Sequence, residues 1–246
     1  LVARYAMWQA PSVAVALLLD GARPAAGTSS RWLAMGAPSM PSLADTGVAA
    51  HPAARVARAA GGLPPLPAAA AEARAVVAGR SADLRLGAEA SEGWLRRAPV
   101  GEYRVLHFAT HALVDARSDA GVALVLAPGD GADGFLTLDE IAALPLRADL
   151  VVLAACRTAA GSGRADTPRT LATTFLFAGA RSVLATRWPV PDRAAARFVT
   201  AFVAAARPGV PLAEALAAAQ RARRQAGERS AVWGAFTLVG AGRHTL

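Results

Sequence analysis

Two side chains capable of covalent chemistry stand at the ends of apolar stretches in this sequence. His111 ends the stretch 105–111, and Cys156, the single cysteine, follows the stretch 151–155. Short apolar runs bounded by polar residues are typical of strands that are covered on both faces. In open parallel sheets, functional residues gather at the carboxyl ends of the strands. If these two strands are neighbours, the imidazole and the thiol lie at the same edge of one sheet. There the thiol could attack an acyl group, with the imidazole as its base, and form a covalent acyl intermediate.

Each of these residues also has an ordinary structural interpretation. A single free cysteine such as Cys156 is often a small buried hydrophobic residue. His111 could be a packed histidine of the core, and this interpretation is the simplest one for His107, two positions after Val105 on the same stretch. The chemical hypothesis therefore depends on His111 and Cys156 being considered together.

The composition predicts one domain spanning residues 1–246. The chain has 246 residues and is 54% hydrophobic, which is enough for one sizeable α/β core. With one cysteine it has no internal disulfide framework, and we expect a reducing, cytoplasmic compartment. No apolar run approaches the roughly 18 residues of a membrane span, so no membrane partner is expected. Because the chain begins at Leu1 and not at Met, we expect it to be part of a longer protein.

The net charge of +8 raises the question of a nucleic-acid partner. All 26 basic residues are arginines scattered along the chain, a bias that a GC-rich coding sequence can produce, so we assign no such partner. The turn 130–134 carries two carboxylates, but the remainder of a calcium loop is missing and a solvated turn is the better interpretation. We expect neither a metal nor an organic cofactor.

The pattern of apolar residues predicts strands alternating with helices. The expected strands are 5–9, 31–35, 83–86, 103–110, 122–127, 149–155, 181–186 and 232–239. The expected helices are 12–19, 66–78, 89–97, 137–144, 170–178, 192–206 and 211–226. Alternation of this kind favours a mostly parallel sheet between two layers of helices. The Pro- and Gly-rich segment 37–67 is the expected mobile insertion, with weak helical character near 52–60.

Other features near the start and middle of the chain refine this prediction. The stretch 13–19 could be the core of a signal peptide, but the Pro11–Ser12 break before it favours a helix inside the fold. Thr137 and Glu140 have the spacing of a capping box.

Five motifs in order make the chain resemble the CHAT domain, a caspase-like peptidase module often found beside tetratricopeptide repeats. They are HFATH (107–111), LTLDEI (136–141), ADLVVLAACRT (148–158), FAGARSVLATRWPV (177–190) and WGAFTLVG (233–240). The resemblance implies a caspase–haemoglobinase-like three-layer α/β/α sandwich with a mostly parallel central sheet. It also implies that further strand sequence precedes Leu1.

The resemblance further implies a cysteine endopeptidase acting on a protein or peptide substrate. Cys156 matches the nucleophile and His111 the histidine that supports its thiolate, 45 residues upstream, close to the spacing known for caspases. A nearby imidazolium would lower the pKa of the thiol. The backbone N–H groups of Cys156 and Ala112 would form the oxyanion hole. A regulatory or tetratricopeptide-repeat region would lie elsewhere in the full-length protein.

The chain departs from the family pattern at two places beside the site. Ala112 stands where the family usually has Gly, and would be strained if that position needs a positive φ. Arg157-Thr158-Ala159 replaces the common Glu-Thr-Gly. These departures leave a second function open, a catalytically decayed module that acts as an interaction scaffold.

The loop that carries Trp188 and Asp192 is expected to reach the same edge of the sheet. In the related separases, the matching segment lines the pocket for the residue before the scissile bond, and an acid there binds a basic residue. Asp192 could instead simply cap its own helix, which is the simpler interpretation.

Overall fold

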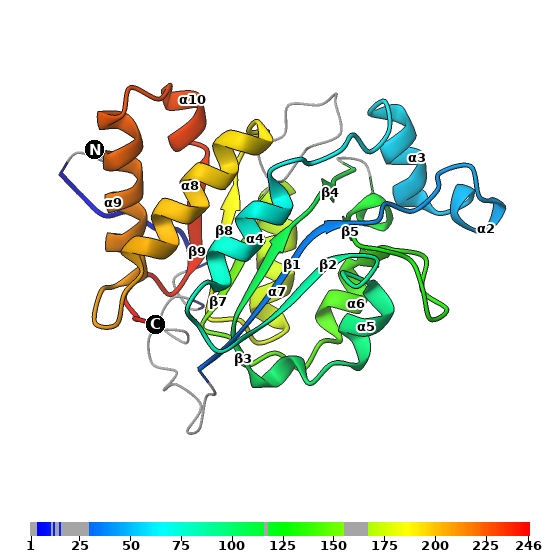
Figure 1. The fold of residues 1–246 in the computed structure, drawn as a ribbon, viewed down its shortest axis with the longest axis horizontal. Helices are drawn as coiled ribbons and strands as arrows, with labels where there is room; N and C mark the ends of the chain where they lie inside the picture. The colour runs from blue at the N-terminus through cyan, green and yellow to red at the C-terminus, as the bar shows by residue number, and fades with distance from the viewer. Residues whose placement is uncertain (1–3, 11, 13–14, 16–29, 116–117, 155–166) are drawn as a thin grey trace.

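The computed structural model describes residues 4–10, 12, 15, 30–115, 118–154 and 167–246. Its central sheet has six strands in the order β2-β1-β3-β7-β8-β9, all parallel except β9, which is antiparallel to β8 (Figure 1). The strands are β1 (Arg31–Pro38), β2 (Ala82–Gly87), β3 (Tyr103–Ala109), β7 (Leu150–Leu153), β8 (Ser182–Thr186) and β9 (Phe236–Gly240). The predicted fold class, an α/β sandwich with a mostly parallel central sheet, is confirmed.

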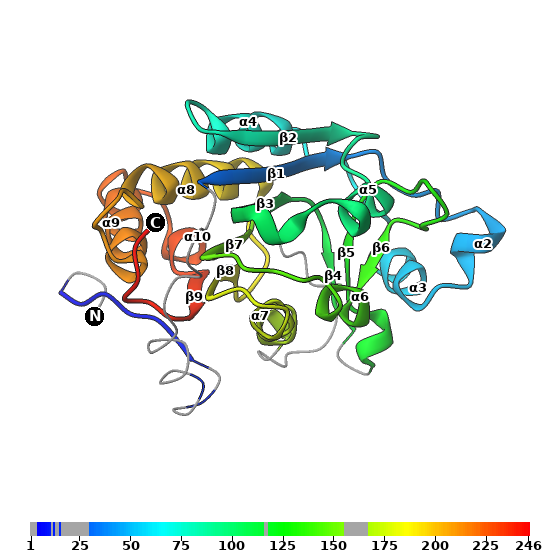
Figure 2. The ribbon, with the colours of Figure 1, turned by 90° about the horizontal axis from the view of Figure 1, so that it is seen from below.

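Helices cover both faces of this sheet (Figures 1 and 2). One face carries α4 (Ala69–Val77), α8 (Asp192–Ala205) and α9 (Leu212–Gln225). The other carries α5 (Glu92–Arg97), α6 (Leu138–Ala142) and α7 (Thr167–Phe177). Short helices complete the described part: α2 (Thr46–Ala49), α3 (Pro52–Ala59), α10 (Ser230–Trp233) and two 3₁₀ turns, Val100–Glu102 and Asp119–Gly121.

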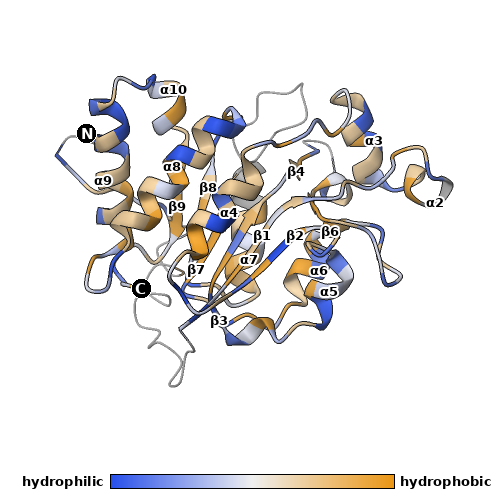
Figure 3. Cartoon of the chain, viewed as in Figure 1, coloured by the Kyte–Doolittle hydropathy of each residue, from blue (hydrophilic) through white to orange (hydrophobic). Residues whose placement is uncertain are grey.

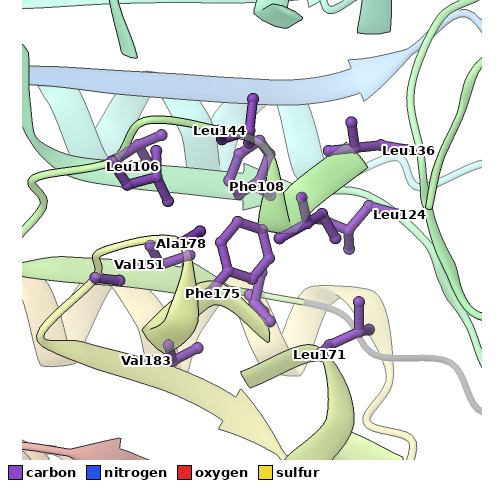
Figure 4. Packing of buried hydrophobic residues seen from close by; sticks show 14 of the residues in the cluster. Leu106, Phe108, Leu124, Leu136, Leu144, Val151, Leu171, Phe175, Ala178 and Val183 are labelled. Carbon is purple, nitrogen blue, oxygen red and sulfur yellow. The ribbon is translucent and has the colours of Figure 1, made fainter. Parts of the chain in front are cut away.

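Cores on both sides of the sheet explain why the central strands are mostly apolar on both of their faces. Leu106 and Phe108 of β3 and Val151 of β7 point into the layer between the sheet and α7, and Phe175 of α7 meets Phe108 with ring centroids 5.8 Å apart (Figure 4). The other side of the same strands is buried beneath α4, α8 and α9. Because both faces are covered, alternation of apolar and polar residues disappears, as the sequence led us to expect.

A close approach of α4 to the sheet depends on one glycine. A Cβ atom on Gly36 of β1 would lie 2.8 Å from the Cβ of Ala73 and 2.9 Å from the carbonyl oxygen of Ala69. Any side chain at position 36 would therefore push α4 outward. Most polar residues of α8 and α9 lie on the side of these helices turned away from the sheet (Figure 3), except Gln220, whose Nε2 donates to the Phe236 carbonyl of β9 at 3.2 Å.

The predicted strand 122–127 exists but does not belong to the central sheet. β5 (Ala123–Val125) pairs antiparallel with β4 (Ala112–Leu113) and β6 (Phe135–Thr137) in a separate sheet. Leu124 contributes to the main core, whereas Ala123 and Val125 pack with α3. The apolar run 122–127 therefore predicted correctly that both faces of the strand are buried. Burial alone, however, does not specify which sheet a strand joins.

Several predicted elements are confirmed near their expected bounds, and others need correction. Helical structure near 52–60 is confirmed as α3, which packs with buried alanines on the second sheet; the mobility of 37–67 stays a prediction. The last strand begins at Phe236 and not at residue 232, because Ser230–Trp233 forms a helical turn. Of the predicted strand 5–9, only Gln9 pairs, in a parallel bridge to Val239. Most of the predicted helix 12–19 lies outside the described residues.

Candidate active site

The two strands expected to carry the chemistry are neighbours. β3 pairs with β7 in parallel, and Phe108 is opposite Leu153. The N–H of Ala154 donates to the Phe108 carbonyl at 3.0 Å, so the pairing continues past the end of β7. β3 and β7 therefore end on the same side of the sheet, since parallel strands share their carboxyl ends. In the sequence, His111 follows the end of β3 by two residues and Cys156 follows the end of β7 by three.

The backbone of His111 is fixed by the second sheet. Its carbonyl accepts from the N–H of Val125 at 2.9 Å. The hydroxyl of Thr110, the preceding residue, donates to the carbonyl of Val125, and Thr110 is buried. These two contacts turn the chain from β3 into β4 and hold His111 directly at that turn.

The His111 ring contacts the segment before α4. Its Nε2 lies 2.7 Å from the carbonyl oxygen of Pro64. A carbonyl oxygen can only accept a hydrogen bond, so Nε2 is the donor and carries a proton. In the neutral ring, Nδ1 is then the nitrogen that can accept a proton. The side chain of His111 is only 1% exposed.

Cys156 lies outside the described residues, as do Arg157, Thr158 and Ala159. The described chain stops at Ala154, two positions before the cysteine, and resumes at the start of α7. The roles expected for the thiol and for the N–H of Cys156 stay predictions.

Ala112 is not strained. The non-glycine residues with positive φ in the described part of the chain are Ala37 and Asp130, so Ala112 has ordinary extended backbone in β4. The bond from the N–H of Val125 to the His111 carbonyl makes Ala112 and Leu124 a non-hydrogen-bonded pair. The N–H of Ala112 therefore points away from β5.

Asp192 does not cap its own helix. Pro191 occupies the N-cap position of α8, and the Asp192 carboxylate instead accepts from the N–H of Ala68 through Oδ2 at 2.7 Å. Ala68 is the N-cap residue of α4. Asp192 therefore holds the start of a different helix, α4. The residue that it holds, Ala68, comes four positions after Pro64, whose carbonyl contacts His111. The negative charge of Asp192 is also favourable in the first turn of α8.

Trp188 is directed to another part of the molecule. Its Nε1 donates to the Ala231 carbonyl of α10 at 2.7 Å, and the side chain is 39% exposed. The structure thus brings His111 and Asp192 to the common segment 64–68, and places Trp188 against α10.

His107 is a packed histidine, as the sequence suggested, but it has an unexpected partner. The ring is fully buried, and its Nε2 lies 3.1 Å from Oε1 of Glu72 on α4, which is itself buried. Burial raises the pKa of Glu72 above its ordinary value; His107 opposes this rise, and the charge of Asp192 adds to it. The pair lies on the α4 side of the sheet beneath His111.

The sequence analysis did not find the contribution of Pro64. A backbone carbonyl leaves no signature in side-chain types, so motif reasoning cannot detect it. Indirect signals were present: Pro64 and Pro65 are stiff, lack N–H donors and come shortly before a helix. The hydroxyl of Thr186 was also missed. It is buried at the end of β8 and has no hydrogen-bond partner among the described residues.

Comparison with known proteins decides the family. The model of the CHAT domain matches residues 1–241. This chain belongs to the CHAT domain family. The resemblance seen in the five sequence motifs is therefore confirmed.

Individual relatives are similar over parts of their length. Tetratricopeptide repeat protein 28 of Mus musculus is 36% identical over 107 residues, which are 43% of this chain and 4% of that protein. A Saccharomyces cerevisiae separase, solved in complex with securin, matches 87% of this chain and 12% of its own chain, with 14% identity and a TM-score of 0.48. This chain thus spans only a small share of the length of either protein.

Two further properties of the described residues bear on partners. None of their helices combines the length and the apolar character that crossing a bilayer requires. The same residues hold no group of three or more His, Cys, Asp or Glu side chains arranged to bind a metal. Asp130 of the predicted solvated turn pairs with Arg97.

Proposed function

We propose that this CHAT domain is a cysteine endopeptidase. The thiolate of Cys156 attacks the carbonyl carbon of a peptide bond and forms an acyl-enzyme, while His111 delivers a proton to the leaving amine. Water then attacks the acyl carbon, His111 takes its proton, and the thiolate is released. The reaction needs neither a metal nor an organic cofactor.

The observation that carries this proposal is the contact of Nε2 of His111 with the Pro64 carbonyl. Because Pro64 accepts from Nε2, Nδ1 is the nitrogen able to take the thiol proton in the neutral ring. The adjacency of β3 and β7 supports the same assignment, since Cys156 follows Ala154 by two residues in the sequence. A histidine held in one tautomer by a backbone carbonyl is suited to general acid and base catalysis.

The backbone at Ala112 supports an oxyanion hole on the His111 side. Its N–H points away from β5 and its backbone is not strained, so Ala in place of Gly removes no donor. We assign the second donor to the N–H of Cys156. Where one such donor has been removed in other enzymes, the loss is about 3 kcal/mol of transition-state stabilisation.

The burial of His111 supports regulation. A ring that is 1% exposed cannot reach a bound peptide until the chain that covers it moves. We assign the trigger for this movement to a region or partner outside the chain. The similarity to Tetratricopeptide repeat protein 28 supports a tetratricopeptide-repeat region in the full-length protein as that regulator.

A catalytically decayed scaffold is the alternative function. Two observations favour it: Arg157-Thr158-Ala159 departs from the residues usual after the nucleophile, and His111 is buried. In this case the domain would bind a protein partner without cutting it.

Cleavage-site mapping separates the two functions. The full-length protein is incubated with a proteome-derived peptide mixture, beside Cys156→Ala and His111→Ala variants and a His51→Gln control whose histidine lies at the start of α3. Cuts made by the wild type and the control, but by neither site variant, support the peptidase. If the Cys156→Ala variant makes the same cuts as the wild type, or if none of the proteins cuts, the peptidase is excluded and the scaffold function is kept.

A further inference from the structure

The segment 64–68 is held from both sides by groups that belong to distant parts of the sequence. At one end, the Pro64 carbonyl accepts from Nε2 of His111 at 2.7 Å. At the other end, the N–H of Ala68 donates to Oδ2 of Asp192 at 2.7 Å. Leu66, between them, is half-buried and packs on the same core layer as Val190, which precedes Asp192 by two residues.

The segment is stiff enough to transmit a displacement from Ala68 to Pro64. Three of its five residues are prolines, whose φ is fixed by their rings. The N–H of Ala69 donates to the Leu66 carbonyl at 3.1 Å, and the N–H of Glu72 donates to the Ala68 carbonyl at 2.9 Å. Ala68 therefore belongs both to the turn that follows Pro64 and to the first turn of α4.

We infer that Asp192 is a positioning residue, which holds the Pro64 carbonyl in place and thereby fixes the tautomer and orientation of His111. This inference rests on the proposed peptidase function. It also differs from the role suggested by the resemblance to separases, in which an acid at this position binds a basic side chain of the substrate. Oδ2 of Asp192 is already used by a backbone donor of its own chain.

The carboxylate is well suited to this task. A hydrogen bond from a backbone N–H to a charged acceptor is stronger than one between neutral groups. Asn at position 192 would keep a side-chain oxygen of the same reach, whereas Ala would leave the N–H of Ala68 without this acceptor. The two variants therefore separate the hydrogen bond from the negative charge.

The test compares Asp192→Ala and Asp192→Asn on two matched peptides that differ only in Arg or Leu before the cut. We expect the Ala variant to lower kcat by about tenfold to a hundredfold on both peptides, with KM changed by less than about threefold. The Asn variant should stay within about threefold of the wild type on both. Loss confined to the Arg peptide in the Asn variant, or an unchanged kcat in the Ala variant, would overturn the inference.

A second measurement does not depend on turnover. The Nε2–H of His111 is followed by nitrogen–proton NMR, with assignment from the His111→Gln variant. We expect its resonance to move or broaden in the Ala variant and to persist in the Asn variant. An unchanged resonance in a folded Ala variant would refute the positioning role, even if the protein cuts no peptide. If the Ala variant does not fold, the Asn variant still decides, because the positioning role requires it to keep the resonance and the rate.

Discussion

The two ends of the central sheet hold polar groups in different ways. At the amino end, Asp149 is buried just before β7 and accepts from Arg104 at 2.7 Å and Arg181 at 3.3 Å. The backbone carbonyl of Asp149 also accepts from Nε2 of His244 at 2.9 Å. At the carboxyl end, Nε2 of His111 donates to the Pro64 carbonyl at 2.7 Å. The amino end pairs a buried carboxylate with two arginine side chains, whereas the carboxyl end holds the ring of His111 in one orientation.

This difference indicates separate purposes for the two ends. The amino-end cluster ties the starts of β3, β7 and β8 to the C-terminal segment, where the Thr245 carbonyl accepts from Arg104 at 3.3 Å. Such a network of paired charges and hydrogen bonds stabilises the fold. At the carboxyl end, the contact with the Pro64 carbonyl fixes which nitrogen of the His111 ring carries the proton, and under the proposed function the other nitrogen takes part in the chemistry. Substitutions at the two ends should therefore separate stability from reactivity.

The largest effect is expected at the carboxyl end. Replacing His111 by Gln should lower kcat by about a thousandfold or more, since both proton transfers are lost. The free energy of unfolding should change by less than about 1.5 kcal/mol, because Gln can still donate to the Pro64 carbonyl. Peptide turnover and urea unfolding of the same preparation check this. A variant that unfolds readily but, where folded, still cuts would reverse the assignment.

The amino end should show the opposite behaviour. Replacing Asp149 by Ala leaves two arginine side chains without their shared carboxylate and should cost about 3 kcal/mol of unfolding free energy. Asp149→Asn, which keeps one acceptor oxygen, should cost less. Turnover per folded molecule should stay within about twofold of the wild type. Urea unfolding with a parallel activity assay measures both quantities, and a large loss of turnover in folded protein would show that the ends are coupled.

The histidine of the amino end predicts a pH dependence of stability. Burial lowers the pKa of His244 below its ordinary value of 6.5, with the charge of Arg181 adding to this effect. The unfolded chain therefore binds this proton more readily than the folded protein. The stabilising contribution is complete above about pH 6.5 and is lost as the pH falls below that value. Urea unfolding between pH 7.5 and 5 should show a smaller loss for His244→Gln than for the wild type; parallel losses would contradict this.

The smallest effect is expected at Ala112. Because its backbone is extended and unstrained, Gly at this position should leave kcat within about twofold and lower the free energy of unfolding by at most about 1 kcal/mol. Turnover and unfolding of the Ala112→Gly variant check both values. A gain of tenfold or more in turnover would show that the alanine side chain hinders the site.

The sequence was most informative about the buried apolar strands that lead to the candidate site residues. Apolar runs identified β3 and β7, and the capping box at Thr137 and Glu140 was found as predicted. That the two strands are neighbours was the condition of the chemical hypothesis, and the structure meets it. The sequence could not assign β5 to its sheet, because its residues are buried whichever sheet covers them. It also could not show that Asp192 holds α4, since a capping residue looks the same whether it serves its own helix or another one.

The central claim, that His111 and Cys156 act on each other at the carboxyl end of the sheet, is tested most directly by the reactivity of the thiol. Because Cys156 is the single cysteine, alkylation by iodoacetamide at pH 6.5, followed by mass spectrometry, reports on that residue alone. The account predicts that the wild type and His51→Gln react at equal rates, and that His111→Gln reacts at least about tenfold more slowly. Equal rates in all three proteins would contradict it.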